Sequence, residues 1–134
     1  MKYFLSILIT MAVLVAPLKT YANSNLYQCQ VMSDAYIRDA GALDVVRDGP
    51  RIGQTFTVIK NTGELLGDVM DALKNPRVVS SGRGKNAYIV IWEQESADKK
   101  GVFVDYLNIE ESVKGKKKPF GFFSGRLLMT GFCE

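Results

Sequence analysis

The densest group of chemically capable side chains in this sequence is a run of lysines followed by an aromatic residue. The residues concerned are Lys114, Lys116, Lys117, Lys118 and Phe120. Concentrated positive charge beside aromatic rings could bind an anionic surface, such as a lipid head group, a polyanionic glycan or an acidic protein face. Lysines in a loop more often keep a hairpin soluble and discourage strand edges from pairing. The run is therefore a candidate binding surface for an envelope protein, a glycan or an anionic lipid, with solubility as the simpler alternative.

A second, smaller basic group lies in Ser81-Gly82-Arg83-Gly84-Lys85. This stretch resembles the end of a phosphate-binding loop, in which backbone N–H groups surround the phosphate. The full pattern also needs a glycine where Val79 stands and a serine or threonine where Asn86 stands. A glycine-rich hairpin turn is therefore the favoured interpretation, and Arg83 and Lys85 join the candidate surface for an anion.

The chain contains no histidine. This excludes Ser-His and Cys-His catalysis and the usual zinc and copper sites, so we expect no metal and no cofactor. Catalysis by carboxylates alone is the remaining enzymatic alternative. A small hydrolase of that kind would require two carboxylates in one cleft. The candidates are Asp105, Glu93, Glu95 and Glu110.

Two cysteines are present, Cys29 and Cys133. In an oxidising compartment thiols tend to pair, so we predict a disulfide that joins the two ends of the mature chain. Closing a loop of about 100 residues would stabilise the fold by roughly 4 to 5 kcal/mol on the chain-entropy model. Free or intermolecular thiols are the alternative.

The first 22 residues have the zones of a signal peptide. Lys2 provides the positive start, residues 4–15 are apolar and uncharged, and Ala22 is a small residue at the cleavage position. The apolar stretch is short for a membrane anchor, which needs roughly 20 residues. We predict a signal peptide over residues 1–22 and a single exported domain over 23–134. The mature protein would be periplasmic or secreted, with no transmembrane segment after cleavage.

The charges of the chain are nearly balanced. It has 17 lysines and arginines against 14 aspartates and glutamates, and two of the lysines, Lys2 and Lys19, lie in the predicted signal peptide. The global charge therefore argues neither for nucleic acid nor for a membrane, and we expect no nucleic-acid partner.

The elements that must position these groups are mainly strands. Apolar residues alternate with polar ones along most of the chain and turn residues separate the runs, which is typical of half-buried antiparallel strands. We predict a small antiparallel β-barrel or sandwich of about six to eight strands, with its termini joined by the disulfide. The clearest strands cover residues 27–31, 42–46, 55–60, 86–94, 102–111, 120–123 and 127–133.

One segment has helical spacing. Leu65, Val69, Met70 and Leu73 recur every three to four residues, and Asn75-Pro76 would end a helix. We therefore predict one short helix over about residues 65–74.

An aromatic-x-Cys strand, Tyr27-Gln28-Cys29, opens the domain and a terminal Cys133 closes it. In this layout the chain resembles the small periplasmic β-barrel inhibitors of lysozyme, and the resemblance covers architecture only. We expect an exported, non-enzymatic binding module of unknown ligand, of the inhibitor or envelope-associated kind. The alternatives are the carboxylate-dependent hydrolase and a β-barrel carrier of an apolar small molecule.

Overall fold

The computed structural model of this chain describes residues 25–70, 73–84 and 86–134. The predicted signal peptide and Lys85 lie outside these ranges. Within them, no helix is long and apolar enough to cross a lipid bilayer.

The described ranges form nine antiparallel strands and no helix, so the all-β prediction is confirmed with one strand more than expected. Two strands are absent from the predicted set: one of two residues inside the segment predicted to be helical, and one over Pro76–Ser81. The strands are β1 (Leu26–Ile37), β2 (Leu43–Val46), β3 (Thr55–Ile59), β4 (Leu65–Leu66), β5 (Pro76–Ser81), β6 (Tyr88–Glu95), β7 (Val102–Ile109), β8 (Lys118–Ser124) and β9 (Leu127–Cys133).

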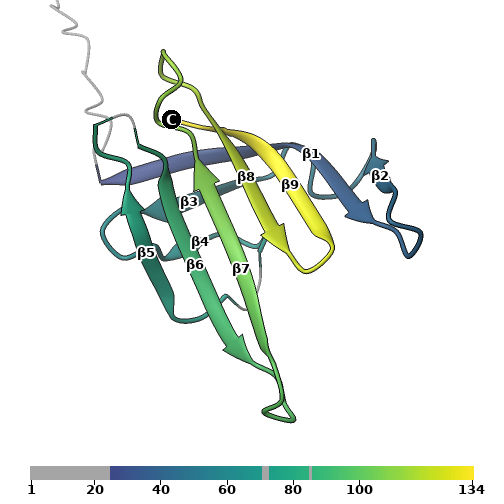
Figure 1. Cartoon of the computed structure of the whole chain (residues 1–134). Helices are drawn as coiled ribbons and strands as arrows, with labels where there is room; N and C mark the ends of the chain where they lie inside the picture. Colours follow the sequence, from purple (N-terminus) through teal and green to yellow (C-terminus); the bar gives the residue numbers. More distant parts are fainter. Residues whose placement is uncertain (1–24, 71–72, 85) are drawn as a thin grey trace, which may run out of the picture.

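All nine strands belong to one sheet. Their order is β4-β3-β1-β9-β8-β7-β6-β5, and β2 pairs with the far end of β1. The sheet curls so that β3 and β4 lie behind β5, β6 and β7, which makes a half-barrel (Figure 1). Of the two predicted architectures, the barrel is therefore the closer one.

The two edges of the half-barrel meet through side chains and a turn. The Tyr88 hydroxyl on β6 donates to the carbonyl of Lys60, 3.0 Å away, just after β3. In the β3–β4 turn, Gly63 has a φ of 77° and packs so closely on β6 that a Cβ there would lie 2.8 Å from Val90. Only glycine fits that position. This end of the half-barrel is closed by packing.

The predicted alternation of apolar residues is confirmed in the core. Phe56 and Val58 on β3, and Leu107 and Ile109 on β7, point to the concave side and are buried. The Phe56 ring meets the Phe120 ring edge to face, with 5.2 Å between their centroids. The inner face of the curled sheet is therefore the hydrophobic core.

A β-bulge in β1 changes which residues face inward. The register of β1 against β9 shifts between Val31 and Ser33. Val31 is fully buried before the bulge, and Asp34 takes the inward position after it. Opposite the bulge, a Cβ at Gly131 would lie 1.9 Å from the Gln30 carbonyl oxygen, so the strands approach closely only because of that glycine. The bulge thus turns the Asp34 carboxylate towards the interior of the half-barrel.

The predicted helix over residues 65–74 is wrong. Leu65 and Leu66 form β4, which pairs with β3, and the chain then continues as bends through Met70. Gly67 takes a φ of 130°, which is not helical, and packs against the backbone of Thr55. The apolar spacing instead places Val69 and Met70 as a cover on the core.

The predicted disulfide is confirmed. Cys29 and Cys133 are directly opposite each other on β1 and β9, with 4.0 Å between their Cα atoms, and the structure joins their sulfurs. The bond closes a loop with a sequence separation of 104 residues. This crosslink is typical of proteins that fold in an oxidising environment.

Replacing both cysteines with serine should lower the free energy of unfolding by about 4 kcal/mol, because the unfolded chain regains the entropy of a long closed loop. Urea denaturation of the variant and of the oxidised wild type measures the difference. Addition of a reductant should destabilise the wild type similarly and leave the variant unchanged. An unchanged midpoint in the variant would show that strand pairing alone determines the stability.

Candidate functional site

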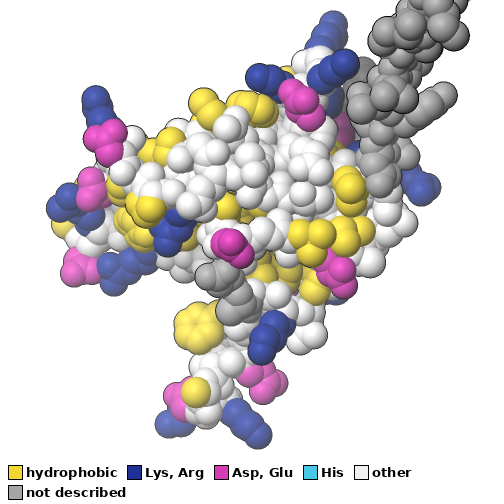
Figure 2. Space-filling model, turned by 180° about the vertical axis from the view of Figure 1, so that it is seen from behind, with side chains coloured by type: hydrophobic (Ala, Val, Ile, Leu, Met, Phe, Trp, Pro, Cys, Tyr) yellow, Lys and Arg dark blue, Asp and Glu magenta, His cyan; other side chains and the backbone are white. Residues whose placement is uncertain are grey.

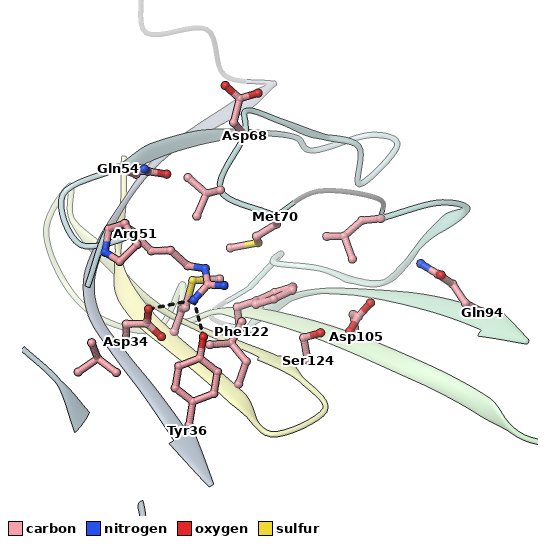
Figure 3. Close-up of a pocket in the computed structure, with 16 residues that line it drawn as sticks. Asp34, Tyr36, Arg51, Gln54, Asp68, Met70, Gln94, Asp105, Phe122 and Ser124 are labelled. Atoms are coloured by element: carbon pink, nitrogen blue, oxygen red, sulfur yellow. Dashed lines mark hydrogen bonds and ion pairs between the residues drawn. The ribbon is translucent and has the colours of Figure 1, made fainter. Parts of the chain in front are cut away.

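The concave side of the half-barrel contains a cavity of about 770 Å³. It lies at the end of the half-barrel where the β6–β7 and β8–β9 hairpins turn, as its lining residues Gln94, Asp105, Ser124 and Leu127 indicate. Figure 3 shows it in close-up. Gly63 closes the opposite end. Its apolar wall combines the inner face of β8 and β9 with the segment after β4. The apolar residues of this wall are Val69, Met70, Leu73, Phe122, Leu127 and Met129.

An ion pair between a buried aspartate and a half-buried arginine forms one side of the cavity. The Asp34 side chain is 1% exposed, and its Oδ2 lies 3.1 Å from Nη1 of Arg51. The same Nη1 donates to the Tyr36 hydroxyl at 2.7 Å, as Figure 3 shows. These hydrogen bonds, first to Tyr36 and then to Asp34, raise the pKa of the Arg51 guanidinium, which stays charged. In the part of the chain that the structure describes, Asp34 Oδ1 has no hydrogen-bond partner.

More polar side chains reach the cavity from the opposite wall. Gln94, Asp105 and Ser124 come from the neighbouring strands β6, β7 and β8 (Figure 3). Alternation along β6 and β7 explains the first two, because Trp92 and Leu107 are buried two residues away on the same face. The cavity therefore has an apolar wall and polar groups on two sides.

The opposite end of the half-barrel carries the lysine-rich loop. Lys118 is held there by structure: its Nζ donates to the backbone carbonyls of Glu111 and Val113 and lies 3.8 Å from Glu111 Oε2. Glu111 also accepts a hydrogen bond from the Tyr27 hydroxyl. Lys118 thus stabilises the β7–β8 connection.

The other residues of the predicted basic surface have different surroundings. Lys114, Lys116 and Lys117 are all exposed, and Lys117 also lies over the Phe132 ring, 4.2 Å from its centroid. Arg83 is exposed in the β5–β6 turn at the same end. Phe120 is 3% exposed because alternation in β8 points it into the core, so it is no part of that surface.

The carboxylates named for a hydrolase are not brought together. Asp105 lines the cavity, whereas Glu93 on the same hairpin faces outward and pairs with Arg77 at 2.9 Å. Glu110 lies at the opposite end and accepts a hydrogen bond from Asn108 at 2.7 Å. Glu95 is exposed two residues beyond Glu93, on the same outer face.

Hydrophobic side chains are also exposed where the β6–β7 hairpin projects from the body. Val102, Phe103 and Val104 are 62%, 65% and 50% exposed. Figure 2 shows yellow side chains on this hairpin with basic and acidic groups beside them, and both signs of charge mixed over the visible face. No single-signed surface dominates this view.

Alkaline pH should destabilise the fold through two buried tyrosines. Burial raises the pKa of the Tyr88 phenol to about 12, and burial with the hydrogen bond to Glu111 raises that of Tyr27 well above its usual range. Phenols in the unfolded chain ionise near pH 10. The contribution of the two tyrosines to the free energy of unfolding is therefore fully present below about pH 10 and decreases as the pH rises towards 12. Urea denaturation from about pH 9 to about pH 11 should show a smaller decrease for Tyr88→Phe than for the wild type. Equal slopes would contradict this origin.

The exposed lysines allow a clean test of the anionic-surface prediction. Lys114→Gln with Lys116→Gln removes two charges without disturbing Lys118, and should lower binding to anionic vesicles by about 1 kcal/mol per lysine at low salt. Lys99→Gln with Lys100→Gln, in the β6–β7 turn at the opposite end, is the charge-matched control and should have little effect. Equal loss in both variants would mean that only net charge matters, and no loss in either would remove the prediction.

No protein-family model matches this chain, and no curated protein or solved structure matches it. These comparisons therefore do not support the expected resemblance to lysozyme inhibitors, and the geometry of the cavity and of the basic end is the basis for a functional proposal.

Proposed function

We propose that this protein is a non-enzymatic binding module of the periplasm or the extracellular space, and that it binds a small ligand in the cavity of the half-barrel. The observation that carries the proposal is a cavity of about 770 Å³ lined by a buried carboxylate with one oxygen unpaired among the described residues. Small-molecule sites in proteins are typically concave, mostly apolar and roughly 300 to 1,000 Å³ in volume. The predicted signal peptide and the disulfide support the compartment.

The mixed lining favours an amphiphilic ligand over a purely apolar one. Phe122 and Met129 offer apolar contact on one wall, and Asp34 and Arg51 offer charged contact on another. A wholly apolar ligand would leave the Asp34 carboxylate buried without gaining a partner, which costs free energy. A ligand with a polar head and an apolar body matches both walls.

The basic end supports a macromolecular partner less well. Lys118 is engaged by backbone carbonyls and Lys117 by the Phe132 ring, so only part of the lysine run is free to act on a partner. Binding of an envelope protein, a glycan or an anionic lipid to the lysine-rich end is a separate proposal. The vesicle measurement on Lys114 and Lys116 tests its lipid form.

The fluorescence of the single tryptophan can detect a ligand in the cavity. Trp92 is buried, and its ring meets the Phe122 ring at 6.2 Å between centroids, while Phe122 lines the cavity. A ligand against Phe122 would therefore change the surroundings of the tryptophan, and the chain has no other indole to obscure the signal.

Titration with N-phenyl-1-naphthylamine, a neutral dye with an apolar body and one N–H group, should raise the dye emission and alter the Trp92 emission together, with saturation. Ser124→Phe places a ring in the cavity and should weaken binding at least tenfold. The control is Ser112→Phe, an exposed position in the β7–β8 connection at the opposite end, which should bind like the wild type. Circular dichroism confirms that each variant is folded. Saturable binding that both variants retain would place the site elsewhere and overturn the proposal.

A further inference from the structure

The charges around the cavity are unequal in sign. Three carboxylates line it, those of Asp34, Asp68 and Asp105, against the single guanidinium of Arg51. Arg51 contacts only one oxygen of Asp34, and its Nη1 is shared with the Tyr36 hydroxyl. The cavity therefore carries an excess of negative charge that one cation does not balance.

The buried carboxylate gives this excess a specific location. Asp34 Oδ1 is a hydrogen-bond acceptor without a partner in the described ranges, although the side chain is 1% exposed. Figure 3 shows the carboxylate at the cavity, beside Arg51 and across from Asp105. A buried charged acceptor without a donor is costly, and a donor supplied by a ligand recovers that cost. The position therefore favours a ligand group that carries both positive charge and an N–H.

A metal ion does not fit these carboxylates. Among the residues that the structure describes, no three acidic or other metal-binding side chains lie close enough together to hold one. Divalent cations such as Ca²⁺ and Mg²⁺ require several oxygen ligands at short range. A monovalent cation that forms hydrogen bonds needs only one or two acceptors.

The apolar wall indicates what the cation is attached to. Phe122, Met129 and Met70 lie on the same cavity as the carboxylates. Flexible methionine side chains adapt to apolar bodies of varied shape, and an aromatic face adds attraction for a cation nearby. An ion without an apolar part would leave this wall unused.

We propose that the cavity binds a primary organic ammonium: a protonated amine attached to an aliphatic or aromatic body, with the ammonium at Asp34 and the body against Phe122 and Met129. This inference rests on the proposed function, because it requires the cavity to be a ligand site. Asp105 on the opposite wall contributes a second negative charge, and Tyr36 holds Arg51 to one side of the carboxylate.

Four probes that share an octyl chain test the head group: octylammonium, octyltrimethylammonium, octan-1-ol and octanoate. Calorimetry and Trp92 fluorescence on the disulfide-intact protein measure their affinities. Octylammonium should bind about tenfold or more tightly than octan-1-ol, and octanoate should bind most weakly because the cavity repels it. Octyltrimethylammonium should bind less tightly than octylammonium, because it keeps the charge and lacks the N–H donor.

Substitutions locate the ammonium. Asp34→Asn should remove the preference for octylammonium over octan-1-ol while octan-1-ol still binds. Because Asp34 is buried beside Arg51, that variant can fail to fold. Asp105→Asn then decides, since this residue forms no ion pair within the described ranges, and its substitution should lower octylammonium affinity several-fold. Glu64→Gln, an exposed charge in the β3–β4 turn at the opposite end, is the matched control and should change nothing.

The outcomes separate the two proposals. If octan-1-ol or octanoate binds as tightly as octylammonium, and Ser124→Phe blocks them, the cavity is a ligand site and the ammonium inference is overturned. An octylammonium preference that persists in both Asp34→Asn and Asp105→Asn also overturns it. If none of the four probes binds, and the neutral dye does not bind either, both the inference and the proposed function fail.

Discussion

The fold depends on the pairing of its first strand with its last. β1 pairs with three strands, β2, β3 and β9, which is more partners than any other strand has in the described part of the chain. Without the β1–β9 ladder, the group β2-β1-β3-β4 would be connected to the β5–β9 meander only through the chain and through packing. The Cys29–Cys133 disulfide joins the two strands within this ladder. Curvature of the sheet, and hence the concave core, follows from the connection of these two halves.

The cavity results from an incomplete closure and one irregularity. At one end, Gly63 and Tyr88 bring the two edges of the half-barrel together, so that end is filled by side chains. At the other end, the sheet stays open, and the β1 bulge turns the Asp34 carboxylate inward. The bulge loses hydrogen bonds of the β1–β9 ladder, and burial of the Asp34 carboxylate removes its hydration. Both features are unfavourable for stability, so the stability of the fold alone would have favoured neither the bulge nor the carboxylate at this position.

Much of the fold could be predicted from local sequence patterns, whereas the candidate site could not. Alternation of apolar and polar residues predicted half-buried antiparallel strands, and the cysteine count predicted the crosslink, because both depend on chemistry that a short stretch or a composition contains. The helix prediction failed at Leu65–Leu66, since the spacing of apolar residues is compatible with a loop that covers a core and the pairing with β3 is non-local. Phe120 was misplaced because the lysines beside it suggested a surface.

The sequence alone does not indicate Asp34 and Arg51 as residues of the candidate site. Continued alternation after Val31 would have turned Ser33 and Ala35 towards the cavity, whereas Asp34 and Tyr36 line it. Nothing in the sequence marks the bulge that makes this difference. Arg51 lies in a connection between β2 and β3 whose path is determined by both strands, so its meeting with Asp34, 17 residues earlier, is a product of the assembled sheet. Sites that depend on a register shift become visible only in three dimensions.

The position of the disulfide also has a mechanical consequence. Since Cys29 and Cys133 are close to the two ends of the described fold, a pulling force applied at the termini would be transmitted through their covalent link and would bypass the sheet. Stretching the oxidised protein would therefore leave the span between the two cysteines unextended. The span between the cysteines would become extensible after reduction, so the redox state would act as a switch for the contour length of the molecule.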